Sequence, residues 1–150
     1  MISLMKMLRS PKIIFIVFFT SLQFIYIEQK IDIMEITDDK KIIEVQQEFH
    51  EKFPFLKIEF YKQAHKSGEG SRGEIQLDPY MTIQDARTDH SEGDLSIHAN
   101  LKVETLEERF EEDYGLHVQV FRKSKQIWLQ TTATDSWTLA EQNERGEQES

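Results

Sequence analysis

Hydrophobic residues recur with two different periods between residues 31 and 132, and these periods predict helices and strands. Spacings of three and four residues predict amphipathic helices over about 38–52 and 104–114, because they place apolar side chains on one side of a helix. Pro54 ends the first helix, and Gly115 suits the left-handed conformation that often follows a helix. The stripes consist of Ile42, Val45, Phe49 and Phe53 in the first helix and of Leu106, Phe110 and Tyr114 in the second.

Strict alternation of apolar and polar residues predicts strands that are buried on one face. The inward positions are Leu56, Ile58, Phe60, Val118, Val120, Ile127 and Leu129. They define strands over 55–61, 116–122 and 126–132, and shorter apolar patterns predict strands over 31–36 and 94–98. A polar stretch with three glycines, 63–80, is a long loop.

Two capping boxes are predicted from a threonine followed three residues later by a glutamate. Thr105 and Glu108 would begin the second helix, and Thr138 and Glu141 would begin a short final helix. The residues that follow, 144–150, are polar and are expected to fray as a tail.

This order of elements predicts an α+β fold in a single domain over residues 31–143. The leading architecture is β-grasp-like, a mixed sheet with one main packed helix and an extra N-terminal helix. The alternative counts 31–36 as the first strand and gives a ferredoxin-like βαββαβ arrangement, with 126–132 added.

Residues 1–30 differ from the rest, because they carry a net charge of +3 whereas the other 120 residues carry −12. A mostly apolar run, 13–27, follows the basic start, as in a signal peptide or signal anchor. No pair of small residues offers a cleavage site after it, and a typical membrane span needs about 20 apolar residues.

Three cellular locations of the domain are therefore compatible with the sequence. If residues 13–27 span a membrane, the basic start favours a cytoplasmic N-terminus and a domain outside. If they direct export, the domain is also outside. If translation begins at Met34, the domain is cytoplasmic and the apolar segment belongs to upstream sequence.

Composition excludes several classes of function. The chain has 18 Lys and Arg against 27 Asp and Glu, a net charge of −9, which argues against a sequence-independent nucleic-acid binder. It has no Cys, so disulfide scaffolds, cysteine-ligated zinc and thiol catalysis are excluded.

Residues 105–143 resemble the second half of ubiquitin-like domains. A capped helix ends at Gly115, a hairpin surrounds Lys123–Lys125, and a charged turn with Thr138-Leu139 follows the last strand. The resemblance implies a β-grasp core. The chain ends in Glu149-Ser150 without a terminal di-glycine, so conjugation to a target is not implied.

The domain is also similar to small uncharacterised bacterial proteins. The stretches that carry this similarity are Phe-Arg-Lys-Ser at 121–124, Ile-Trp-Leu at 127–129 and Asp-Ser-Trp-Thr-Leu at 135–139. The similarity implies that the domain from about residue 34 is a genuine unit, and it implies no activity.

The sequence offers two weak candidates for ligand chemistry. Gly68, Gly70 and Gly73 match the dinucleotide-binding pattern, but no strand leads directly into them and no helix follows, so a flexible loop is favoured. Two histidines and a carboxylate, His90, Asp94 and His98, could hold a divalent metal, perhaps with His65. Their spacing fits no metal motif, and a solvated loop is favoured. No catalytic or cofactor-binding residue is assigned.

Alternation also gathers aromatic side chains on one face of the predicted sheet. Tyr61, Phe121 and Trp128 lie opposite the inward positions, beside Lys57, Arg122, Lys123 and Lys125. If this face is open, it forms a protein-docking patch, since Tyr, Trp and Arg dominate interface hot spots. If helix 38–52 covers it, the aromatics form a second core layer.

The sequence thus favours a small non-catalytic protein-binding or adaptor module with an unidentified protein partner, without cofactor, metal or nucleic acid. Contact with a membrane is expected only if residues 13–27 act as an anchor. The alternative function is a small metal-dependent hydrolase built on the cluster around residues 90–98.

Overall fold

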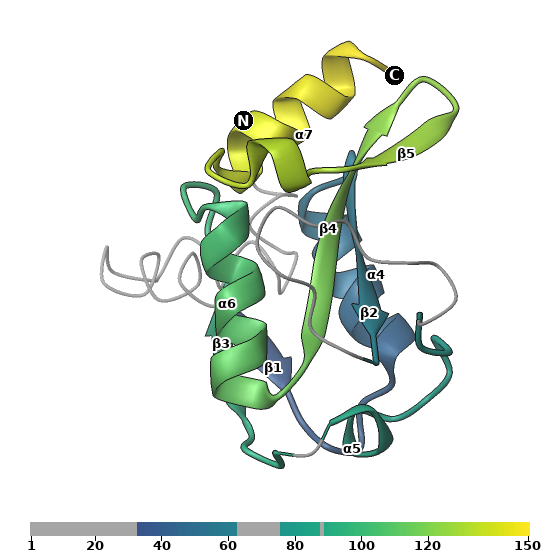
Figure 1. The fold of residues 1–150 in the computed structure, drawn as a ribbon, viewed down its shortest axis with the longest axis vertical. Coiled ribbons are helices and arrows are strands. Elements are labelled where there is room, and N and C mark those ends of the chain that lie inside the picture. Colours follow the sequence, from purple (N-terminus) through teal and green to yellow (C-terminus); the bar gives the residue numbers. More distant parts are fainter. Residues whose placement is uncertain (1–32, 63–75, 88) are drawn as a thin grey trace, which may run out of the picture. The chain divides into compact units, whose positions relative to one another are not determined.

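The computed structural model describes residues 33–62, 76–87 and 89–150, and residues 33–150 form one compact unit. The predicted α+β class is confirmed. In chain order the elements are β1 (Ile33–Ile36), α4 (Ile42–Lys52), β2 (Leu56–Tyr61), α5 (Ile83–Ala86), β3 (Gly93–Ser96), α6 (Val103–Tyr114), β4 (His117–Ser124), β5 (Ile127–Gln130), the 3-10 turn η2 (Thr132–Thr134) and α7 (Leu139–Gln148) (Figure 1).

The strands form two separate antiparallel sheets in the described part of the chain. One sheet pairs β1 with β3, and the other has the order β2-β4-β5. Both the β-grasp-like and the ferredoxin-like prediction expected one sheet, and both are therefore wrong about the number of sheets. The physical reason lies at the outer edge of β2, where the carbonyls of Leu56 and Ile58 bind side chains of α4 and leave no room for another strand.

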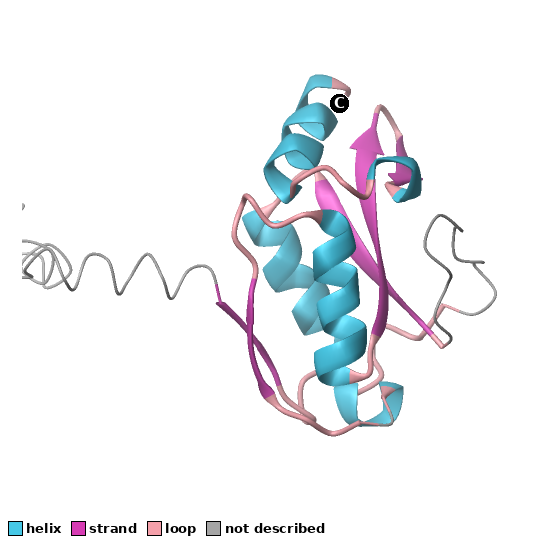
Figure 2. Ribbon diagram, turned by 60° about the vertical axis from the view of Figure 1, so that its left-hand side comes forward, coloured by secondary structure: helices cyan, strands magenta, loops and turns pink. Residues whose placement is uncertain are grey.

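The core lies where the two helices α4 and α6 meet both sheets, and Figure 2 shows these helices between the sheets. α4 buries Ile42, Val45 and Phe49, the stripe that the sequence predicts. The rings of Phe60 on β2 and Phe110 on α6 meet edge to face, 5.9 Å apart. The inward-facing residues of β2 and β4 thus pack against both helices.

The start of α6 differs from the prediction. The helix begins one turn earlier than a Thr105 cap allows, with Lys102 at the N-cap position and no side-chain cap. The backbone N–H of Val103 instead donates to the carbonyl of Trp137, so a distant segment satisfies the first turn. The end is as predicted, because Gly115 has φ 63° and its N–H donates to Glu111 and Phe110.

The C-terminal residues form a helix rather than a frayed tail. The predicted capping box of Thr138 and Glu141 is confirmed, but α7 continues through Gln148. Gly146 is the reason, because it lets the helix approach Phe55 so closely that an added Cβ would lie 2.8 Å from the Phe55 Cβ. The side chain of Asn143 also accepts a hydrogen bond from the Phe55 N–H.

β5 extends past the core. Its register with β4 pairs Arg122 with Leu129 and Ser124 with Ile127, which places both apolar side chains on the predicted face. They are nevertheless exposed, Ile127 by 58% and Leu129 by 38%. The prediction that both side chains face the core is therefore wrong. α7 takes up the space beneath this end of the sheet, where Arg122 donates to Gln142.

In the described ranges, no helix is long and apolar enough to cross a membrane. The predicted apolar segment 13–27 lies outside the described residues, as do His65 and the glycines between residues 68 and 73. Met34 is a buried residue of β1, paired with Leu95.

Candidate functional site

Two of the three predicted aromatic residues come together on one face of the β2-β4-β5 sheet. Phe121 pairs with Lys57 across β4 and β2, and Trp128 pairs with Lys123 across β5 and β4. The Lys57 ammonium lies 5.2 Å from the centre of the Phe121 ring and 5.3 Å from that of Trp128. Both distances fall within the range of cation–π attraction.

α4 and α6 pack mainly against the opposite face of this sheet, and α4 reaches the aromatic face through His50, whose ring meets Trp128. Both helices pack against Leu56, Ile58 and Phe60, whose side chains point to the opposite side of the sheet. Phe121 and Trp128 do not belong to the buried core, so the described residues do not form the second core layer that the alternative expects beneath the first helix. Both rings are half-buried, and the Lys57 ammonium lies over each of them.

Tyr61 does not belong to this patch, which corrects the prediction. It lies four residues along β2 from Lys57, forms an isolated bridge with Gln76, and is only 3% exposed. Burial, and then the charge of Glu59, raise the pKa of its hydroxyl to about 12. Tyr61 is thus a neutral core residue.

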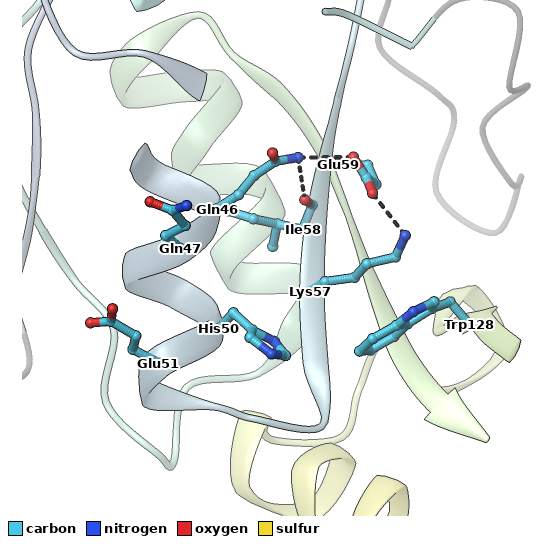
Figure 3. A pocket seen from close by; sticks show the side chains of 8 residues that line it. All are labelled: Gln46, Gln47, His50, Glu51, Lys57, Ile58, Glu59 and Trp128. Atoms are coloured by element: carbon cyan, nitrogen blue, oxygen red, sulfur yellow. Dashed lines mark hydrogen bonds and ion pairs between the residues drawn. The ribbon is translucent and has the colours of Figure 1, made fainter. Parts of the chain in front are cut away.

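A groove of about 560 Å³ adjoins the aromatic face (Figure 3). One wall is α4, the other is Trp128, and β2 forms the floor. The lining residues are Gln46, Gln47, His50, Glu51, Lys57, Ile58, Glu59 and Trp128. Figure 3 shows the His50 and Trp128 side chains on opposite sides of this space.

A hydrogen-bond network holds the floor of the groove in place. Glu59 accepts from Lys57 at 2.8 Å, from Gln46 at 2.8 Å and from Gln76 at 2.6 Å. The Gln46 amide also donates to the Ile58 carbonyl, at 2.9 Å. Lys57 is therefore fixed from two sides, by the Glu59 carboxylate and by the two rings.

His50 presents one defined nitrogen to the groove. Its Nδ1 lies 2.8 Å from the Leu56 carbonyl oxygen, which can only accept, so Nδ1 carries the proton. In the neutral ring Nε2 is then an acceptor. The ring meets Trp128 edge to face at 6.2 Å. Amide, imidazole, ammonium and carboxylate side chains thus line the groove.

The structure does not gather the predicted metal ligands. His90 Nδ1 lies 3.1 Å from Asp38 Oδ2, Asp94 lies on β3 opposite Glu35, and His98 follows that strand. Within the described ranges, no three His, Asp or Glu side chains are placed to hold a metal ion. The metal-dependent hydrolase therefore lacks a site among these residues.

Sequence reasoning missed the partner of His90. The buried Arg87 side chain donates to Asp38 at 2.9 Å and to the Ser91 carbonyl at 2.6 Å. Burial raises the pKa of the Asp38 carboxyl, but hydrogen bonds from His90 and Arg87 outweigh it, and the pKa falls below its usual value. The cluster links the loop that contains Asp38 to the loop over residues 87–91, and no spacing in the sequence predicts it.

Glu107 on α6 also forms contacts that helical spacing does not reveal. It is half-buried and accepts from the Val120 N–H at 2.8 Å and from the Gln119 amide at 3.1 Å. Its pKa is raised to about 8. Burial is the main cause, the Val120 hydrogen bond acts against it, and the Asp135 charge adds to it. It satisfies a backbone group that β5 does not reach.

Comparison with known proteins found no matching family model, no similar curated protein and no similar solved structure.

Proposed function

We propose that this protein is a small non-catalytic binding module that holds a protein partner on the face formed by Phe121, Trp128 and Lys57. The observation that carries the proposal is the fixed Lys57 ammonium, held near two half-buried rings on the sheet face opposite Leu56, Ile58 and Phe60. Such rigid aromatic and cationic side chains lose little entropy on binding.

The groove between α4 and Trp128 supports the same proposal. It lies beside the rings and offers amide, imidazole and carboxylate groups. A partner side chain that enters it would meet Trp128 and the free Nε2 of His50 at once. A mixture of aromatic wall and a few fixed polar groups is typical of binding sites.

The test is affinity capture with the full chain and a Phe121→Ser, Trp128→Ser double variant. Proteins retained by the wild type are quantified by mass spectrometry. We expect at least one to be lost from the double variant, and its binding is then measured with purified protein. Tyr80→Ser is the matched control, because Tyr80 is an aromatic residue exposed by 72% elsewhere. It should change nothing.

Thermal unfolding of each variant completes the test. The double variant should fold, because neither ring belongs to the buried core. If it does not fold, the rings are structural and the proposal fails. A Trp128→Ser single variant that folds and keeps every partner would also contradict it.

A further inference from the structure

The two outer edges of the β2-β4-β5 sheet differ. On β2, the carbonyls of Leu56, Ile58 and Phe60 accept from His50, Gln46 and the Leu77 N–H. β5 is the last strand on the other side, and no described strand pairs with its outer edge. Proteins normally protect such an edge with a charge, a proline or a covering segment.

The residues of β5 do not protect its exposed edge in this way. Ile127, Trp128 and Leu129 are three consecutive large apolar residues. The Lys123 N–H donates to the Phe55 carbonyl, toward β2, so the register turns the backbone groups of Trp128 away from β4. Ile127 and Leu129 stand exposed on one face, and Trp128 lies on the other.

Charge is also segregated around this edge. Residues 116–134 contain Arg122, Lys123 and Lys125 and no acidic residue, although the chain has 27 Asp and Glu. Arg122 is engaged by Gln142 and Glu149. Lys123 and Lys125 form no ion pair within the described ranges. Lys123 lies on the face of Trp128.

We propose that the partner is an acidic, extended segment of another protein, which adds as a further strand along β5. This inference rests on the proposed function. Backbone hydrogen bonds to the outward groups of Trp128 would set its register. Since side chains alternate along a strand, its acidic residues would face Lys123, and its apolar residues would cover Ile127 and Leu129.

Charge disfavours the other occupants. The chain's own residues 1–30 have a net charge of +3, which the basic hairpin repels. A second copy that paired β5 with β5 would bring two basic hairpins together. An acidic strand gains attraction at the same place, so charge complementarity favours it.

The experiment selects binders from a display library of random linear peptides against the immobilised full chain. We expect the enriched peptides to alternate acidic and apolar residues. Lys123→Glu should weaken their binding about tenfold, because it reverses the charge that faces them. Lys62→Glu is the matched control at the opposite end of the sheet and should leave affinity unchanged. Enriched peptides without acidic residues would overturn the proposal.

A second measurement separates the docking mode from the docking face. On saturation with a selected peptide, the Trp128 amide should exchange its hydrogen more slowly, and N-methylation of alternate peptide amides should abolish binding. A third outcome is that peptide binding requires the Phe121 and Trp128 side chains, but the Trp128 amide is not protected and N-methylation does not weaken binding. That outcome would support the proposed binding module and would contradict strand addition. A dimer in sedimentation with a protected Trp128 amide would identify a second copy and also overturn the proposal.

Discussion

Glu107 lies in surroundings unlike those of its exposed neighbours Glu108 and Glu111, although all three belong to one acidic helix. The tertiary fold brings Glu107 to the backbone N–H of Val120 in β4, which donates to it. The position of a residue on a helix thus sets the direction in which its side chain points. Whether that side chain meets solvent or a backbone group depends on the strand beside the helix.

The first prediction concerns Glu107→Gln, which keeps the acceptor oxygen and removes the ionisation. The folded pKa of about 8 lies above the ordinary 4.5, so the stability from this group is present below about pH 4.5 and is lost as the pH rises through 8. We expect the variant to gain up to a few kcal/mol in unfolding free energy over the wild type between about pH 5 and pH 9. Urea unfolding at several pH values measures it.

Glu108→Gln is the control for this series, because Glu108 is exposed on the same helix. Its stability should follow the wild type at each pH. If the Glu107→Gln and wild-type curves also run parallel across the whole range, the buried-acid interpretation of Glu107 is wrong.

At the scale of elements, the periodic patterns located the helices and strands, but the ends were decided by contacts. α7 was predicted to start at the Thr138 capping box, and it does. Its last two turns looked polar and unsupported in the sequence. They form because Gly146 packs on Phe55 and because Arg145 pairs with Glu149, one helical turn away.

The second prediction concerns Gly146→Ala. In an exposed helix this change stabilises by about 1 kcal/mol, because alanine has the higher helix propensity. Here the new Cβ would lie 2.8 Å from the Phe55 Cβ and 3.0 Å from its carbonyl oxygen. We therefore expect destabilisation of about 1–3 kcal/mol in urea unfolding. Glu147→Ala, an exposed neighbour, should change it by less than about 0.5 kcal/mol. A stabilised Gly146→Ala variant would show that α7 is not docked through this residue.

For residues 33–150 as a whole, the two sheets depend on one shared core. A two-stranded ribbon such as β1-β3 is only marginally stable alone. Its inward residues Met34, Ile36 and Leu95 are buried in the same cluster as the helices and the larger sheet. We therefore expect both sheets to unfold in a single transition.

The third prediction tests this coupling with Leu95→Ala. Leu95 is 2% exposed, and truncating a buried leucine costs about 2–5 kcal/mol. The chain's two tryptophans, Trp128 and Trp137, lie outside the β1-β3 sheet. Their fluorescence should still report the full loss of stability, at the same midpoint as circular dichroism. Ser96→Ala is the exposed control. Separate midpoints would mean that the small sheet unfolds alone.

Local patterns in the sequence predicted the α+β class, the positions of the main helices and strands, the Gly115 helix end and the shared face of Phe121 and Trp128. All of these follow from local periodicity and from the backbone preferences of single residues. Long-range packing, in contrast, sets the two separate sheets, the burial of Tyr61 and the exposure of Ile127 and Leu129. It also brings His50 and Trp128 to one groove. These features depend on contacts between residues far apart in the chain, which no local pattern encodes.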